Sequence, residues 1–146
     1  MSAEYAIETY RGVVYPWQLD HMDHMNVQFY TAFFDAATWH LFAALGMTTS
    51  YFKTNGRGMA ALDMRTLFKR ELHAGALVRI TSELLEAKPK TIHFLHRMYE
   101  SESGAEAATA EIVGAHIDTA ARKSVPFPEH IVKRHRDFIG KRASSA

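Results

Sequence analysis

The seven residues from Asp20 to Asn26 hold two aspartates, two histidines and an asparagine. They come directly before an apolar segment with helical spacing. Asn26 is a favoured N-cap residue, because its side chain can accept a hydrogen bond from an exposed backbone N–H. The start of a helix offers unpaired N–H groups and the positive end of the helix dipole. A carboxylate folded back to that point would lie beside donors for an oxyanion, which is the minimal equipment for hydrolysing an activated acyl group.

The same polar cluster allows two other interpretations. His21 and His24 are three residues apart. With Asp20 and Asp23 they could bind a metal ion, although a His-x-x-His pair without a third strong ligand at a known spacing is a weak signal. In the second interpretation an aspartate here only caps the helix. We expect no metal.

Two further sets of polar residues lie in expected strands. Asp63 stands among apolar residues, where an ionised carboxylate needs a compensating group. Two explanations stay open: an ion pair with Arg65, two residues on along the same face, or a place in the lining of the active site. His93 and His96 are not expected to bind one metal ion together, because residues three apart in a strand point to opposite faces.

The composition excludes several classes of protein. A chain of 146 residues is the usual size of one domain, and we treat residues 1–146 as a single domain. The chain has no cysteine, which excludes disulfides, a thiolate nucleophile and an iron–sulfur cluster. The 17 basic residues barely exceed the 16 acidic ones, so we expect no nucleic-acid partner. The longest apolar stretch is interrupted by Asp35 and His40, so we expect no membrane span and a cytoplasmic location.

The rest of the chain supplies the elements that must position the cluster. A helix is expected from Asn26 to Gly46, with Gly46 as the residue that ends it. It is apolar around most of its circumference, which is typical of a buried helix. One of its stripes has helical spacing and comprises Val27, Tyr30, Phe34, Ala37 and Leu41.

Five segments are rich in strand-forming residues. They are residues 6–15, 59–72, 77–85, 91–99 and 107–118. The last four are joined by short turns, which predict antiparallel neighbours. Residues 47–58 are expected to form a loop, 129–139 a short helix, and 139–146 a loose tail. We predict an α+β fold in which an antiparallel sheet of about five strands packs against one long helix. Its open edges favour a homodimer or homotetramer.

The spacing Asp20-x3-His24-x-Asn26-x3-Tyr30, followed by an aromatic-rich helix, resembles the signature of the 4-hydroxybenzoyl-CoA thioesterase-like branch of the hotdog-fold family. The segment Phe68-Lys69-Arg70-Glu71-Leu72-x2-Gly75-x2-Val78 resembles the second strand of that family and its turn. The order of elements fits from about residue 6 to 130. The resemblance implies an acyl-CoA thioesterase with a sheet wrapped around a central helix, which dimerises edge to edge and has its sites at the subunit interface.

The resemblance also implies roles for individual residues. The family carboxylate falls on Asp20, which would act as a general base on water or as a nucleophile on the thioester carbonyl. The backbone N–H of Val27 would polarise that carbonyl. His24 and Asn26 match the motif and would shape the loop or contact the substrate, and Tyr30 would pack or line the pocket.

Two lysines resemble the family by position rather than by motif. Lys88 and Lys90 correspond to basic residues that meet the phosphates of coenzyme A in this branch, and the alternative is that they are ordinary solvated charges. No cofactor is implied, since coenzyme A enters as part of the substrate.

The sequence departs from the family at Asp23, where a glycine is usual. Glycine adopts a positive φ without steric cost, whereas aspartate does so less readily. A second carboxylate beside Asp20 can also split the pKa values of the pair. Asp23 is therefore a candidate catalytic participant, and the substitution is equally compatible with altered specificity or an inactive site.

Two other functions compete with hydrolysis. A non-catalytic acyl-CoA-binding module would keep the pocket without turnover. Hydratase chemistry on the same fold typically has an Asp and a His separated by four residues, whereas three residues separate Asp20 from His24.

Overall fold

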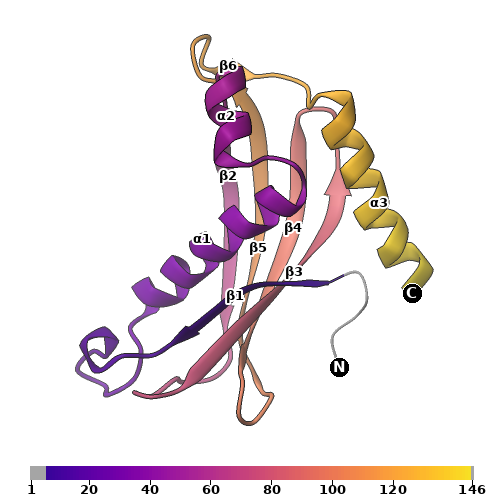
Figure 1. Ribbon diagram of the computed structural model, residues 1–146. Coiled ribbons are helices and arrows are strands. Elements are labelled where there is room, and N and C mark those ends of the chain that lie inside the picture. Colours follow the sequence, from indigo (N-terminus) through magenta and orange to yellow (C-terminus); the bar gives the residue numbers. More distant parts are fainter. Residues whose placement is uncertain (1–5, 146) are drawn as a thin grey trace.

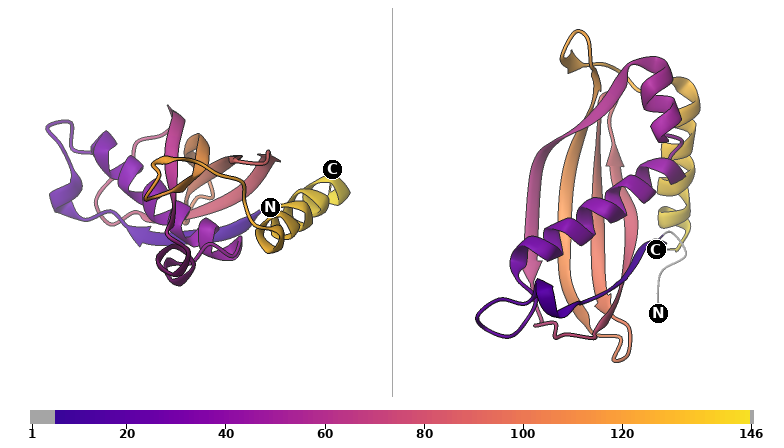
Figure 2. Two further views of the ribbon diagram at one scale, coloured as in Figure 1. Left: turned by 90° about the horizontal axis from the view of Figure 1, so that it is seen from above. Right: turned by 60° about the vertical axis from the view of Figure 1, so that its left-hand side comes forward.

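The computed structural model describes residues 6–145, with side chains as far as residue 141. Its elements are β1 (Ile7–Val13), the 3-10 turn η1 (Pro16–Gln18), α1 (Val27–Ala44), α2 (Thr49–Asn55), β2 (Arg57–Phe68), β3 (Leu77–Ala87), β4 (Thr91–Glu100), β5 (Glu106–Asp118), β6 (Lys123–Ser124) and α3 (Glu129–Ser145). All neighbouring strands are antiparallel, in the order β1-β3-β4-β5-β2, and β6 pairs with β5. Helix α1 lies across one face of this curved sheet (Figures 1 and 2). The predicted α+β architecture is confirmed.

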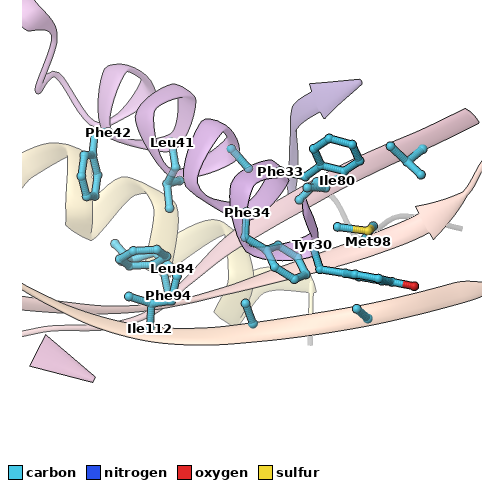
Figure 3. Close-up of a cluster of buried hydrophobic side chains, with 14 of the residues drawn as sticks. Tyr30, Phe33, Phe34, Leu41, Phe42, Ile80, Leu84, Phe94, Met98 and Ile112 are labelled. Atoms are coloured by element: carbon cyan, nitrogen blue, oxygen red, sulfur yellow. The ribbon is translucent and has the colours of Figure 1, made fainter. Parts of the chain in front are cut away.

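The core lies between α1 and the sheet. Phe34, Ala37 and Leu41 of the helix are fully buried. They belong to a cluster with apolar side chains of β3, β4 and β5, several of which are labelled in Figure 3. Burying each large apolar side chain contributes about 1.5–3 kcal/mol, so this layer fixes the helix on the sheet. The position of α1 in turn sets the position of the polar loop before it.

One side of α1 is open, which corrects the expectation of a helix buried around most of its circumference. Val27, predicted on the buried stripe, is 57% exposed, and Trp39 is 53% exposed. Phe33 and Phe42, which lie off that stripe, are buried instead. The helix has only one sheet to pack against, so the apolar residues on its other side face outward.

A chain of polar side chains crosses this apolar core. The His96 ring lies 2.5 Å from the Ser82 hydroxyl through Nδ1 and 2.8 Å from the Thr38 hydroxyl through Nε2. Ser82 also contacts Thr9 at 2.7 Å, so the chain links α1, β4, β3 and β1. Burial lowers the pKa of His96 to about 3, and the ring is neutral at pH 7. His93 faces the other way and pairs with Glu111, as the strand spacing predicted.

Two expectations for the remaining segments were wrong, and one short strand was not predicted. The expected loop 47–58 contains α2, which is capped by the Thr48 side chain and ended by Gly56 at φ 59°. The C-terminal helix continues to Ser145, so residues 139–145 are helical rather than a loose tail, and Ala146 lies outside the described residues. The short strand β6 was not anticipated. Within residues 6–145, no helix has the length and apolar character required to cross a bilayer.

Candidate active site

The loop before α1 is held closed by backbone hydrogen bonds. Asp20 N–H donates to the His24 carbonyl at 3.1 Å, and Asp23 N–H donates to the Asp20 carbonyl at 3.0 Å. Its far end is fixed by bonds from Met25 N–H to the Leu72 carbonyl and from Asn26 N–H to the Gln18 carbonyl. The polar cluster therefore has one defined shape.

The Asp20 carboxylate is held by two donors. Oδ1 accepts a hydrogen bond from Met22 N–H at 2.9 Å, and Oδ2 accepts one from the Asn26 side-chain amide at 3.0 Å. These bonds, Met22 first, lower the pKa of Asp20 below its ordinary value. The lowered pKa keeps the carboxylate ionised at neutral pH. Because the residue is only half-buried, a reactant can reach it.

Asn26 connects this carboxylate to the helix. Its side-chain oxygen accepts from Gln28 N–H at 3.0 Å and caps α1, while its amide nitrogen donates to Asp20. Val27 is the first residue of the helix, so its N–H lies among the four that have no intrahelical partner. The predicted N-cap is confirmed, and the structure brings Asp20, Asn26 and Val27 together.

A cleft of about 230 Å³ opens beside these groups, lined by His24, Met25, Val27, Tyr30 and residues 68–71. The Tyr30 hydroxyl donates to the Arg70 carbonyl at 2.9 Å, and its ring meets Phe68 edge to face. Burial raises the pKa of Tyr30, which is therefore neutral and part of the wall. His24 lies 3.6 Å from a carboxylate oxygen of Glu71. The end of β2 and the three residues after it form the second wall of the cleft, which was not predicted from the sequence.

Asp23 adopts the conformation for which glycine is suited. Its φ is 60°, and its side chain is exposed. Its carbonyl lies 3.3 Å from the His73 ring, whereas no hydrogen bond joins its carboxylate to Asp20 within the described residues. The loop thus keeps a left-handed residue at this position at the cost of backbone strain.

Replacing Asp23 by glycine is expected to stabilise the protein and to leave turnover within a few-fold. The left-handed conformation costs a non-glycine residue energy, so Asp23→Gly should raise the free energy of unfolding by about 0.5–1 kcal/mol, measured by urea denaturation. Asp23→Asn is the matched control, because asparagine tolerates this conformation and lacks the charge. A large loss of turnover in both variants would instead make the Asp23 carboxylate a participant.

The remaining three site candidates lie away from Asp20. Lys88 is exposed and lies 3.5 Å from Glu86, and Lys90 is exposed in the same turn between β3 and β4. Strand β3, of 11 residues, separates this turn from the Asp20 loop by about 36 Å. The two segments lie at opposite ends of the sheet (Figure 1).

Asp63 is exposed on β2, and no ion pair joins it to Arg65 within the described residues. Solvent therefore compensates its charge.

A family model described as the thioesterase-like superfamily matches residues 14–134. The chain belongs to this superfamily. The match covers the loop, α1 and every strand of the sheet except β1, and the expected hotdog fold is confirmed. It includes Asp20, Asn26 and Val27, the three groups that meet at the start of the helix.

The chain is also similar in sequence to individual thioesterases. The chain is 28% identical to a betainyl-CoA thioesterase of Pseudomonas aeruginosa, over 88% of this chain and 80% of that protein. It is 28% identical to an L-carnitine dehydrogenase/betainyl-CoA thioesterase of Rhizobium meliloti, over 80% of this chain and 23% of that longer protein.

Two solved structures share the fold. A Staphylococcus aureus protein in complex with CoA superposes with a TM-score of 0.87 at 20% identity, over 97% of this chain and 89% of its own. A 1,4-dihydroxy-2-naphthoyl-CoA thioesterase from Synechocystis gives a TM-score of 0.78 at 14% identity, over 90% and 96% of the two chains.

Proposed function

We propose that this chain hydrolyses acyl-CoA thioesters to a free acid and coenzyme A. The observation that carries the proposal is the ionised Asp20 carboxylate held by Asn26 at the first turn of α1. A thioester carbonyl needs a nucleophile on its carbon and a donor for the negative charge that develops on its oxygen. The loop and the helix supply these two requirements side by side. Membership of the thioesterase-like superfamily supports the same chemistry.

The reaction follows from this placement. The thioester oxygen faces the Val27 N–H, and Asp20 either takes a proton from the attacking water or attacks the carbonyl carbon itself. In the first route the tetrahedral intermediate collapses with loss of the CoA thiolate. In the second route a mixed anhydride forms as the thiolate leaves, and water then hydrolyses it. In both routes the thiolate takes up a proton.

The acyl group is proposed from the relatives. Two of them are named betainyl-CoA thioesterases, so betainyl-CoA is the first substrate to test on this chain. The test is release of free thiol from betainyl-CoA and from short, medium, branched and aromatic acyl-CoAs. Since the chain has no cysteine, a thiol reagent reports coenzyme A alone. Thiol release with matching free acid is expected, and no release from any member would contradict the proposal.

We infer that two copies pair through β2. This strand lies at the edge of the sheet and exposes Leu62, Leu67 and Phe68. An edge strand has unpaired N–H and C=O groups, so a second β2 would continue the sheet about a two-fold axis. Such pairing would bring Lys88 and Lys90 of one copy toward Asp20 of the other. Light scattering should give a multiple of the 16.5 kDa chain mass, and a monomer at micromolar concentration would contradict this pairing.

Asn26→Asp separates the two tasks of Asn26. An aspartate caps the helix as well as an asparagine, so the free energy of unfolding should change by less than about 1 kcal/mol. It cannot donate to Asp20, and its charge raises the pKa of the neighbouring carboxylate. The acid limb of the pH profile of kcat should therefore move to higher pH. An unchanged profile would show that Asn26 does not act through Asp20.

A further inference from the structure

A second cavity lies along the open side of α1. It has a volume of about 170 Å³ and lies between the helix and strands β2, β4 and β5. Thr31, Asp35 and Trp39 line it from the helix. Met59, Met64 and Phe94 are among the residues that line it from the sheet. The sequence showed Asp35 only as an interruption of an apolar stretch and did not predict this cavity.

This cavity lies farther along the same helix from the proposed reaction centre. Val27, Thr31, Asp35 and Trp39 follow one another at four-residue spacing, so they lie along one side of the helix. Thr31 begins the cavity about 6 Å along the helix axis from Val27, at 1.5 Å per residue. Side chains of a helix tend to lean toward its N-terminus, which for Asp35 is the direction of Thr31 and the Asp20 loop. An acyl group whose carbonyl meets the Val27 N–H and that follows this side of the helix would reach this cavity.

The cavity wall combines one negative charge with aromatic rings. Asp35 is the one charged side chain among the residues that line the cavity, and no lysine or arginine pairs with it in residues 6–141. Asp35 is exposed to solvent, so water compensates its charge until a cation takes that place. Trp39, Phe42 and Phe94 add aromatic rings, and a tryptophan face attracts quaternary ammonium groups.

The cavity is small and partly open to solvent. Its volume of about 170 Å³ suits a short acyl group. An acyl group with a terminal carboxylate would be repelled by Asp35.

We propose that this cavity receives the acyl group and selects a short acyl group that carries a positive charge, such as a quaternary ammonium, with Asp35 and Trp39 as the residues that determine this specificity. The inference rests on the proposed thioester hydrolysis and deepens it. Asp35 balances the charge of the acyl group, and the ring of Trp39 contacts its methyl groups. Neither residue takes part in bond breaking.

The test compares substrates of equal shape. Betainyl-CoA and 3,3-dimethylbutyryl-CoA differ only in the replacement of the ammonium nitrogen by carbon. The wild type is expected to prefer the cationic member at least tenfold in kcat/KM. Asp35→Asn and Trp39→Leu should each bring this ratio toward one. Glu129→Gln is the control, because it removes a negative charge from exposed α3 and should leave the ratio unchanged.

The other outcomes distinguish a failure of the specificity inference from a failure of the proposed hydrolysis. A wild-type ratio near one, or a ratio that Asp35→Asn leaves unchanged, would overturn the inference while thioester hydrolysis stands. No cleavage of either substrate would contradict the proposed function. In that case calorimetric binding of the two thioesters to wild type decides the inference, and equal affinities would overturn it.

Discussion

Replacing Asp20 by asparagine is expected to lower kcat at least 100-fold while substrate binding persists. Asparagine has nearly the same shape and can still accept the hydrogen bond from Met22 N–H. It cannot take a proton from water, and its amide is a poor nucleophile at a thioester. A positioned general base contributes about 10²–10⁴-fold to the rate, and the loss should fall in that range.

The measurement is steady-state thiol release, paired with the calorimetric affinity for the acyl-CoA. Asp23→Asn is the matched control, since it removes a carboxylate from the same loop three residues away and should keep most of the turnover. If Asp20→Asn released thiol within threefold of the wild-type rate, Asp20 would not be the catalytic carboxylate.

Lowering the pH from 7.5 to 5 is expected to destabilise the fold by at least about 2 kcal/mol. Burial lowers the pKa of His96 to about 3, and the same residue titrates near 6.5 when unfolded. Between these two pKa values His96 is protonated in the unfolded chain and neutral in the folded chain. The contribution is fully present above pH 6.5, and it falls by about 1.4 kcal/mol per pH unit below that value.

Two other histidines act in the same direction. Burial lowers the pKa of His135 to about 4 and also lowers that of His116. Carboxylates with lowered pKa values, such as Asp20 and Asp118, lose their contribution only below about pH 4, because their unfolded values lie there. The loss of stability between pH 6.5 and 4.5 therefore reflects protonation of the histidines.

Urea denaturation at pH 7.5, 6 and 5 measures this effect. His135→Phe should flatten the pH dependence, because the ring nitrogen Nε2 of His135 is buried without a hydrogen-bond partner in the described residues. His40→Gln is the control, because His40 is exposed on α1. A free energy of unfolding that stayed constant or rose toward pH 5 would contradict the burial of neutral histidines.

Much of the fold could be predicted because the apolar pattern has a direct structural cause. The strand segments alternate or carry β-branched residues, and the helix starts at Asn26 and ends before Gly46 as their capping chemistry requires. Helix α2 was missed, because seven residues rich in Thr, Ser and Asn carry no helical apolar period. Its stability comes from a cap at Thr48 and from contacts of Phe52 with Phe42, which a sequence does not display.

The site was predictable only where it is local in sequence. Asp20, Asn26 and Val27 lie within eight residues, and their meeting follows from one loop and one helix cap. The wall formed by residues 68–71 comes from a distant strand, and its placement depends on the sheet register. The exposed side of α1 could not be identified from hydrophobicity, since Val27 and Trp39 are as apolar as their buried neighbours.

The most direct test of the central claim is the number of coenzyme A thiols released per protomer by the wild type with betainyl-CoA in excess. The account predicts many thiols per protomer, with one equivalent of free acid for each. One thiol or fewer per protomer, with the thioester still bound and intact, would contradict hydrolysis and would identify the chain as a non-catalytic acyl-CoA-binding module.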